Sequence, residues 1–155
     1  MGTVRDQVRP EDVGMRYLSL AHSLRRTVDE HMTAGGVSLA RTKVLQVLDR
    51  LGPLRQARLA AELGFAARSV SQTIESLEQD GLVHRGPHPD DGRAKLVALT
   101  AEGSVALATG TAAGEQLLRR VFGSLDQDSL TNLDELLKVV ESGVAAAARP
   151  TPRRR

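Results

Sequence analysis

The chain has 155 residues, of which 41% are apolar and 2% aromatic, and its formal net charge is +2, so the sequence allows one compact domain with an aliphatic core, which suits packed helices. It contains no cysteine, which excludes disulfides, cysteine-based zinc sites and thiol redox sensing. Because no apolar run approaches the roughly 20 residues of a membrane span, and the first ten residues lack the apolar segment of a signal peptide, we expect a cytoplasmic protein without a membrane partner.

The N-terminal part predicts one helix after a short flexible segment. Residues 1–10 are polar, and we expect this terminus to fray. From Val13 to Val28, apolar residues recur at spacings of three and four, which is the period of an amphipathic helix. A glycine pair ends the pattern, so the first helical segment covers residues 11–36.

Three shorter helices are predicted next. The first begins after Ser38, a suitable N-cap residue, and ends at the Gly-Pro pair of residues 52–53. The second covers about residues 55–63. Gly64 supplies permissive backbone for a tight turn into the third helix, over residues 67–79.

The pattern then changes to a predicted β-hairpin. Residues 82–85 and 94–99 are two short extended segments, and residues 86–92 between them form a loop rich in glycine and proline. This arrangement indicates two strands with a long tip.

Two long helices and a tail complete the chain. Thr100 can cap an alanine-rich helix that reaches about Gly123, and Asp126 or Asp128 can cap the last helix. Residues 149–155 hold four arginines and two prolines, which is typical of a disordered basic tail.

The last two helices carry more apolar side chains than a small hairpin-bearing domain can cover. A self-complementary twofold interface would bury them, and the alternative is an ordinary pair of helices within one chain. Gly110 and Gly114 lie four residues apart, which would allow another helix to approach closely. We expect a homodimer whose dimerisation helices lie in residues 11–36 and 100–148. The apolar residues are Leu117, Leu118, Val121, Phe122, Leu125, Leu133, Leu136, Leu137 and Val140.

The order of short helix, glycine-bearing turn, helix and hairpin predicts a winged helix-turn-helix over residues 37–99. Val70, Ile74 and Leu77 can bury the inner face of the second of these helices. Its outer face offers guanidinium, amide and hydroxyl groups, which match the base edges and phosphates of a DNA major groove. These groups belong to Arg68, Ser69, Ser71, Gln72 and Thr73. The predicted fold class is mainly α-helical with a small two-stranded β-wing and a helical dimerisation region.

The hairpin supplies a second set of candidate DNA contacts. An arginine on a narrow protrusion, here Arg93, can enter a minor groove, and Asp91 could hold its guanidinium in place. Arg85 and Lys95 at the hairpin base, and Arg55 before it, are candidates for phosphate contacts.

A solvated helix face is the simpler interpretation of the polar residues taken alone. Residues 55–95 contain six basic and six acidic side chains, so DNA binding depends on where the charges lie rather than on their sum. A winged-helix module that binds a protein instead of DNA is the alternative function.

At this point the sequence resembles the MarR family of transcriptional regulators, over about residues 13–144. The resemblance implies a homodimer that binds a pseudo-palindromic DNA operator, with Arg93 in the minor groove and Asp91 supporting it. Two departures are Ala66-Ala67, where a hydroxyl residue often starts the recognition helix, and Gly92, where a long side chain is common. The matching stretches are residues 54–64, 70–72, 77–83 and, most specifically, 90–103, Asp-Asp-Gly-Arg-Ala-Lys-Leu-Val-Ala-Leu-Thr-Ala-Glu-Gly.

The family resemblance also implies a repressor that a small aromatic or anionic molecule releases from DNA. Tyr17, His22 and Arg26 on the first helix are candidates to line such a pocket, and surface or interface packing is the alternative role for them. No nucleophile elbow, phosphate loop or convincing histidine pair is present, so we expect no enzymatic activity, no cofactor and no metal.

Overall fold

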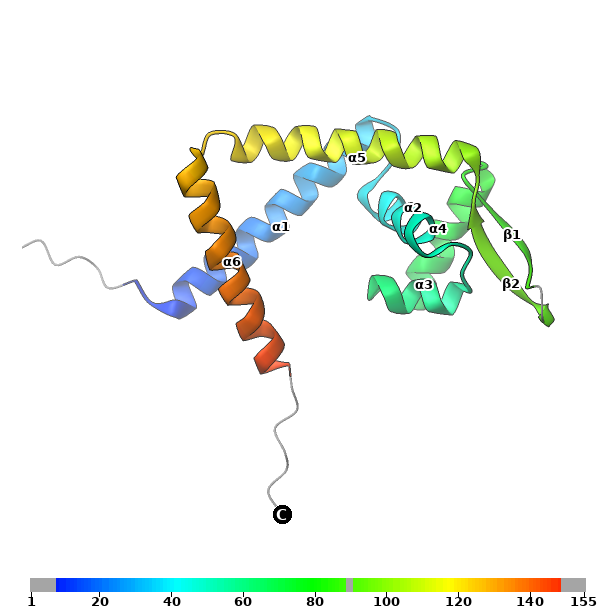
Figure 1. The fold of residues 1–155 in the computed structure, drawn as a ribbon, viewed down its shortest axis with the longest axis horizontal. Helices are drawn as coiled ribbons and strands as arrows, with labels where there is room; N and C mark the ends of the chain where they lie inside the picture. Colours follow the sequence, from blue (N-terminus) through cyan, green and yellow to red (C-terminus); the bar gives the residue numbers. More distant parts are fainter. Residues whose placement is uncertain (1–7, 89–90, 149–155) are drawn as a thin grey trace, which may run out of the picture. The chain divides into compact units, whose positions relative to one another are not determined.

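The computed structural model of the chain describes residues 8–88 and 91–148, without the side chains of residues 88 and 91–94. Within this part, six helices and one two-stranded sheet follow the predicted order (Figure 1). The chain divides into two compact units, Met1–Leu117 and Leu118–Arg155. The elements are α1 (Pro10–Ala34), α2 (Leu39–Leu51), α3 (Gln56–Leu63), α4 (Ala67–Gln79), β1 (Val83–His88), β2 (Asp91–Leu99), α5 (Ala101–Phe122) and α6 (Gln127–Ala147).

The predicted fold class is confirmed. Polar N-cap side chains explain why the starts of several helices could be predicted from the sequence. The Ser38 hydroxyl accepts a hydrogen bond from the Arg41 amide at 3.3 Å, at the start of α2. Thr100 Oγ1 accepts from the amide of Gly103 at 2.9 Å, at the start of α5. Of the two aspartates proposed for α6, Asp126 is the cap. Each cap satisfies an amide that the first turn of a helix leaves without a partner.

The core of the first unit lies where α2, α3, α4 and the two strands meet. The apolar stripe predicted on α4 is fully buried there, which confirms the expected inner face of that helix. Burial of each such side chain contributes about 1.5–3 kcal/mol. The fully buried residues are Val44, Leu45, Leu48, Leu59, Val70, Ile74, Leu77, Val83 and Val97.

The hairpin is longer than the sequence predicted, and the expected loop at residues 86–92 is wrong in extent. Gly86 pairs with Leu96 and Pro87 with Lys95, and the register shifts between Pro87 and His88. Proline has no backbone N–H to donate. It is tolerated in β1 because β1 is an edge strand, whose outer side pairs with no further strand. Strands β1 and β2 extend away from the group of α2, α3 and α4 (Figure 1).

A short pairing that the sequence did not predict fixes the other edge of β2. Leu54 donates its amide to the Val97 carbonyl at 3.0 Å and accepts the Val97 amide at 2.8 Å. This isolated bridge ties the segment between α2 and α3 to the hairpin, so the wing base is held on both sides.

Small residues bring α5 close to α1 and α2. A Cβ on Gly110 would lie 2.5 Å from Thr42 Oγ1, and a Cβ on Gly114 would lie 3.3 Å from Met32 Sδ. The predicted close helix approach at Gly110 and Gly114 is therefore present, and it occurs within one chain.

The second unit contains the end of α5 and the whole of α6. No residue of α6 is buried in the single chain. Large apolar side chains of this unit are exposed instead, at 38% for Leu118 and 51% for Val140. The remaining exposed apolar residues of this unit are Val121, Leu136, Val139 and Val144.

Candidate nucleic-acid interface

Helices α3 and α4 are joined by a turn that only a special backbone conformation allows. Gly64 has φ 62° and ψ 27°, which is the left-handed region that glycine adopts without steric cost. Its amide and that of Phe65 bond back to the carbonyls of Ala61 and Ala60. The turn therefore ends α3 sharply and aims α4 with its apolar stripe toward the core.

The face of α4 opposite that stripe presents the predicted polar residues. Arg68, Ser69 and Gln72 are exposed, and Ser71 and Thr73 are half-buried. The structure thus brings all five residues onto one helix, as predicted. Arg68, Ser69 and Gln72 lie in the first half of α4, the half that a recognition helix places deepest in the groove.

Two of the five hydroxyl or polar groups already have intramolecular partners. Thr73 Oγ1 donates to the Ser69 carbonyl at 2.9 Å, and Ser71 Oγ donates to Glu75 Oε1 at 3.3 Å. Their donor capacity is engaged within the helix, so Arg68, Ser69 and Gln72 are the stronger candidates for reading a ligand.

The start of α4 lacks a side-chain cap, as the sequence indicated. Ala66 occupies the N-cap position with φ −61° and ψ 138°, and it makes no side-chain cap hydrogen bond. The first amides of the helix consequently receive no help from a hydroxyl at that position.

Both acidic residues at the end of α4 are paired with arginines from neighbouring elements. Glu78 Oε2 lies 2.6 Å from Arg85 Nη1 on β1, and Asp80 Oδ2 lies 2.5 Å from Arg41 Nη2 on α2. The phosphate contact of Arg85 stays a prediction, and in the structure its guanidinium lies against Glu78. Spacing along the chain did not reveal the cross-element partner of either acid.

The remaining predicted contacts belong to the wing and the start of α3. Lys95 is exposed on β2, and Arg55 is exposed at the N-cap position of α3. Asp91 and Arg93 lie on β2 by their backbone, whereas their side chains fall outside the described part of the chain. The predicted Asp91–Arg93 pairing lies outside it too.

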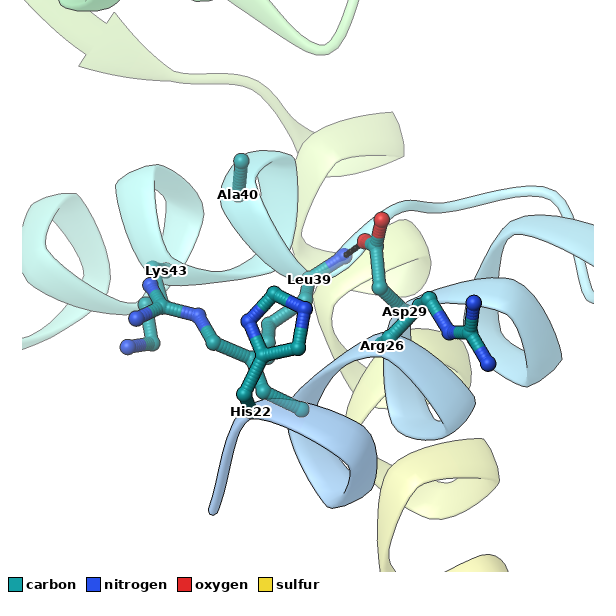
Figure 2. A pocket seen from close by; sticks show the side chains of 7 residues that line it. His22, Arg26, Asp29, Leu39, Ala40 and Lys43 are labelled. Carbon is teal, nitrogen blue, oxygen red and sulfur yellow. Dashed lines mark hydrogen bonds between the residues drawn. The ribbon is translucent and has the colours of Figure 1, made fainter. Parts of the chain in front are cut away.

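A pocket of about 250 Å³ lies between α1 and α2. Figure 2 shows His22, Arg26 and Asp29 of α1 beside Leu39, Ala40 and Lys43 of α2. Asp29 Oδ1 accepts a hydrogen bond from the Leu39 amide at 2.8 Å, so this carboxylate is engaged at the start of α2 (Figure 2).

The effector pocket stays a prediction, and two of the three residues proposed for it lie at this cavity. His22 and Arg26 line the cavity, and Tyr17 does not belong to its lining. Sequence reasoning missed Arg25 and Lys43, which also line it. The helical spacing of Arg25 from His22 was a usable signal, whereas Lys43 comes from another helix and left none.

A second, more open pocket of about 490 Å³ lies beside the start of α4. Arg25 and Ala40 border both pockets, and Ser69 and Thr73 of α4 border the second. Lys43 Nζ lies 6.0 Å from the centre of the Phe65 ring, within cation–π range. The α1–α2 pocket and the turn before α4 are therefore neighbours.

The described part of the chain holds no group of three or more histidine or carboxylate side chains that could bind a metal ion. None of its helices is long and apolar enough to cross a membrane.

Two helices that are joined by a tight turn at a glycine and followed by a β-hairpin define a winged helix-turn-helix protein. A sequence model described as MarR family matches residues 35–94. The chain is 30% identical over 129 residues to the HTH-type transcriptional regulator ML2140 of Mycobacterium leprae, which covers 81% of this chain and 87% of that protein. The chain belongs to the MarR family of transcriptional regulators.

Two further similarities agree with this membership. The chain is 23% identical over 136 residues to the HTH-type transcriptional repressor IacR of Pseudomonas putida, covering 87% of this chain and 81% of that protein. The fold also resembles that of a mutant MarR from E. coli complexed with operator DNA, with a TM-score of 0.70, 24% identity and coverage of 83% and 93%.

Proposed function

We propose that this regulator binds duplex DNA as a homodimer, with α4 in the major groove and the β1–β2 wing beside the minor groove. The observation that carries the proposal is the two-sided character of α4. Val70, Ile74 and Leu77 are fully buried on one side, while Arg68 and Gln72 are exposed on the other. The solved complex of MarR with operator DNA supports this use of the fold.

The distribution of charge supports DNA binding despite the balanced totals. The acids at the end of α4 are paired with Arg85 and Arg41, which reduces their repulsion of phosphate. The groove-facing half of α4 contains Arg68 and no acidic residue. Lys95, Arg55 and the side chain of Arg93 would add contacts to the backbone and the minor groove.

The homodimer is proposed from uncovered apolar surface. Helix α6 buries none of its residues in the single chain, and Leu118, Leu136 and Val140 are between 38% and 56% exposed. Part of α1 is similarly uncovered, with Leu18 at 63%. A twofold interface between two copies would remove this surface from water and set two winged lobes at a fixed spacing.

Repression and its release by a small molecule are proposed from the relatives and the α1–α2 pocket. A relative of the chain, IacR, is a transcriptional repressor. Arg25, Arg26 and Lys43 give the pocket cationic groups, which favours a small anionic or aromatic carboxylate effector. Because such a regulator works at the chromosome, we also propose a cytoplasmic location and no catalytic step.

The direct test is selection of bound sequences from a pool of random duplex DNA by the full-length chain. We expect enrichment of a pseudo-palindrome whose half-sites lie about one helical turn apart. Failure to enrich any sequence at about 50 mM salt, where phosphate contacts are strongest, would reject DNA binding. Capture of a specific protein partner in that case would favour the alternative, a winged-helix protein-interaction module.

The effector proposal needs a separate measurement. Salicylate serves as the probe, because it is a small aromatic carboxylate. We expect it to raise the dissociation constant for the selected duplex, and the double variant Arg25→Ala, Arg26→Ala to lose this response while it still binds DNA. The matched control is Arg16→Ala, which removes a cation from α1 outside the pocket lining. An equal response in the control and the double variant would exclude this pocket.

A further inference from the structure

One carboxylate at the end of α4 contacts the wing through two hydrogen bonds. Glu78 Oε2 accepts from Arg85 Nη1 at 2.6 Å, and Glu78 Oε1 accepts from the backbone amide of Arg85 at 3.3 Å. The two side chains are 36% and 24% exposed, so the pair is partly withdrawn from water. Both oxygens of the carboxylate are therefore directed at one residue of β1, which fixes direction as well as distance.

The other contacts at this end of α4 lead to different elements. Asp80 pairs with Arg41 of α2 at 2.5 Å, and the Gly81 carbonyl accepts from Thr100 Oγ1 at 2.8 Å, at the start of α5. These bonds attach the end of α4 to the helical part of the unit. Loss of the Glu78–Arg85 pair would leave these bonds and the buried base of the wing in place, and it would remove only the polar link that fixes the direction of β1 relative to α4.

We propose that Glu78 and Arg85 are positioning residues that set the angle between α4 and the wing, and that Arg85 is not a phosphate contact. The inference rests on the proposed function, because the angle matters when α4 and the wing enter adjacent grooves of one duplex. A fixed angle matches the spacing of those grooves before binding, so less free energy is spent on ordering the complex.

Substitution of Glu78 distinguishes this positioning role from a phosphate contact, because the two roles predict opposite changes in DNA affinity. If Arg85 binds phosphate and Glu78 merely lies nearby, Glu78→Gln removes a repulsive charge and strengthens binding to every duplex. If the pair positions the wing, Glu78→Gln weakens binding to the selected duplex. The structure favours the second result, because Glu78 holds both the guanidinium and the amide of Arg85.

The experiment measures affinity for two probes over a series of salt concentrations. The probes are a duplex selected by the wild-type chain and a scrambled duplex of equal length and composition. For Glu78→Gln and Arg85→Ala we expect roughly tenfold weaker binding to the selected duplex, which is the effect of losing one charged hydrogen bond. Binding to the scrambled duplex should weaken less. The salt dependence of the affinity should not change. The charge-swapped pair Glu78→Arg, Arg85→Glu should recover only the part of the loss that the ion pair carries, because arginine has no acceptor for the backbone amide of β1.

Lys95→Ala is the matched control, because it removes one cation from the same wing at an exposed position. It should weaken binding to both duplexes by the same factor. The slope of log K against log salt should become shallower, as expected for the loss of about one phosphate contact per subunit. If Arg85→Ala behaves like Lys95→Ala, or if Glu78→Gln strengthens binding, the positioning role is wrong.

A measurement without DNA separates this inference from the proposed function. The Arg85 amide donates to Glu78, so amide hydrogen exchange at the start of β1 should be faster in Glu78→Ala, which removes the acceptor, than in the wild type. Exchange that stays unchanged in this variant overturns the inference even if the wild-type chain binds DNA. If exchange is faster in the variant but the wild-type chain enriches no DNA sequence, the proposed function is rejected. The Glu78–Arg85 link between α4 and the wing is then retained.

Discussion

Gly103, in the first turn of α5, lies directly against the main-chain carbonyl of Leu82, which connects α4 to the wing. The same carbonyl accepts a hydrogen bond from the Thr100 amide at 3.2 Å, and the Leu99 side chain closes the space from the other side. The start of α5 is therefore packed against the base of the wing, where the winged helix-turn-helix joins α5.

Gly103→Ala should destabilise the chain, because its Cβ would collide with the Leu82 backbone, which has no flexible end to move away. We expect a loss of about 1–3 kcal/mol in the free energy of unfolding, typical of an overpacked position. Urea denaturation followed by circular dichroism measures it. Gly14→Ala in α1 is the control, since nothing lies within 4 Å of its Cβ, and it should stabilise by up to about 1 kcal/mol. Equal stability of the two variants would contradict the close contact.

Gln72→Ala should relax base preference at one position of each half-site. The amide is exposed on the outer face of α4 and can pair with an adenine edge, so its loss should cost about 1–3 kcal/mol of discrimination. Competition binding with every base at each position is the measurement. Gln79→Ala, at the exposed end of the same helix, serves as the control. An unaltered preference at every position would remove Gln72 from the reading set.

Arg93→Ala should lower affinity for the selected duplex and make the slope of log K against log salt shallower. A loss of one cationic contact per subunit changes the slope by roughly one to two units per dimer. The measurement is a salt series of the equilibrium constant. A slope and affinity equal to those of the wild type would exclude Arg93 from the interface.

Val140→Asp should break the proposed homodimer. Val140 is 51% exposed in the single chain, and in a twofold interface each copy would bury an unpaired carboxylate. We expect the dimer dissociation constant to rise at least roughly 100-fold, measured by sedimentation equilibrium. Ser142→Asp adds the same charge at another exposed position of α6 and should leave the mass unchanged. A dimer that tolerates Val140→Asp would place the interface elsewhere.

Acid should weaken α6 through its cap. The Asp126 carboxylate accepts hydrogen bonds from the side chain and amide of Ser129, and these bonds hold its pKa below the ordinary value. The stabilisation is therefore complete above the unfolded-state pKa of about 4 and is lost as pH falls through the lower folded-state pKa. Asp126→Asn keeps a cap that does not titrate. The free energy of unfolding of the wild type should fall relative to this variant only below about pH 4, and a constant difference would contradict the assignment.

Much of the fold could be predicted because its signals are local. Ser38 and Thr100 cap helices through bonds to amides only three residues away, and Gly64 interrupts the chain between two apolar stripes. The apolar spacing of α4 alone indicated its buried side. The polar residues opposite that stripe, Arg68 and Gln72 among them, followed from the same helical period.

Other features depend on residues far apart in the chain, and local patterns carry no trace of them. Gly86 and Pro87 suggested a loop, but pairing with Lys95 and Leu96 draws them into a strand. The ion pair between Arg85 and Glu78 joins β1 to α4, and no local pattern indicated it. Leu54 joins β2 although nothing around it indicates a strand.

The sequence by itself determined the order of the helices, the sides they bury and the outward polar residues of α4, because caps and periodicity act over a few residues. Only the tertiary structure decided which charges are paired and which neighbour each glycine admits, as Thr42 at Gly110. Those outcomes depend on side chains meeting across long loops, where distance in space is set by packing of the whole unit.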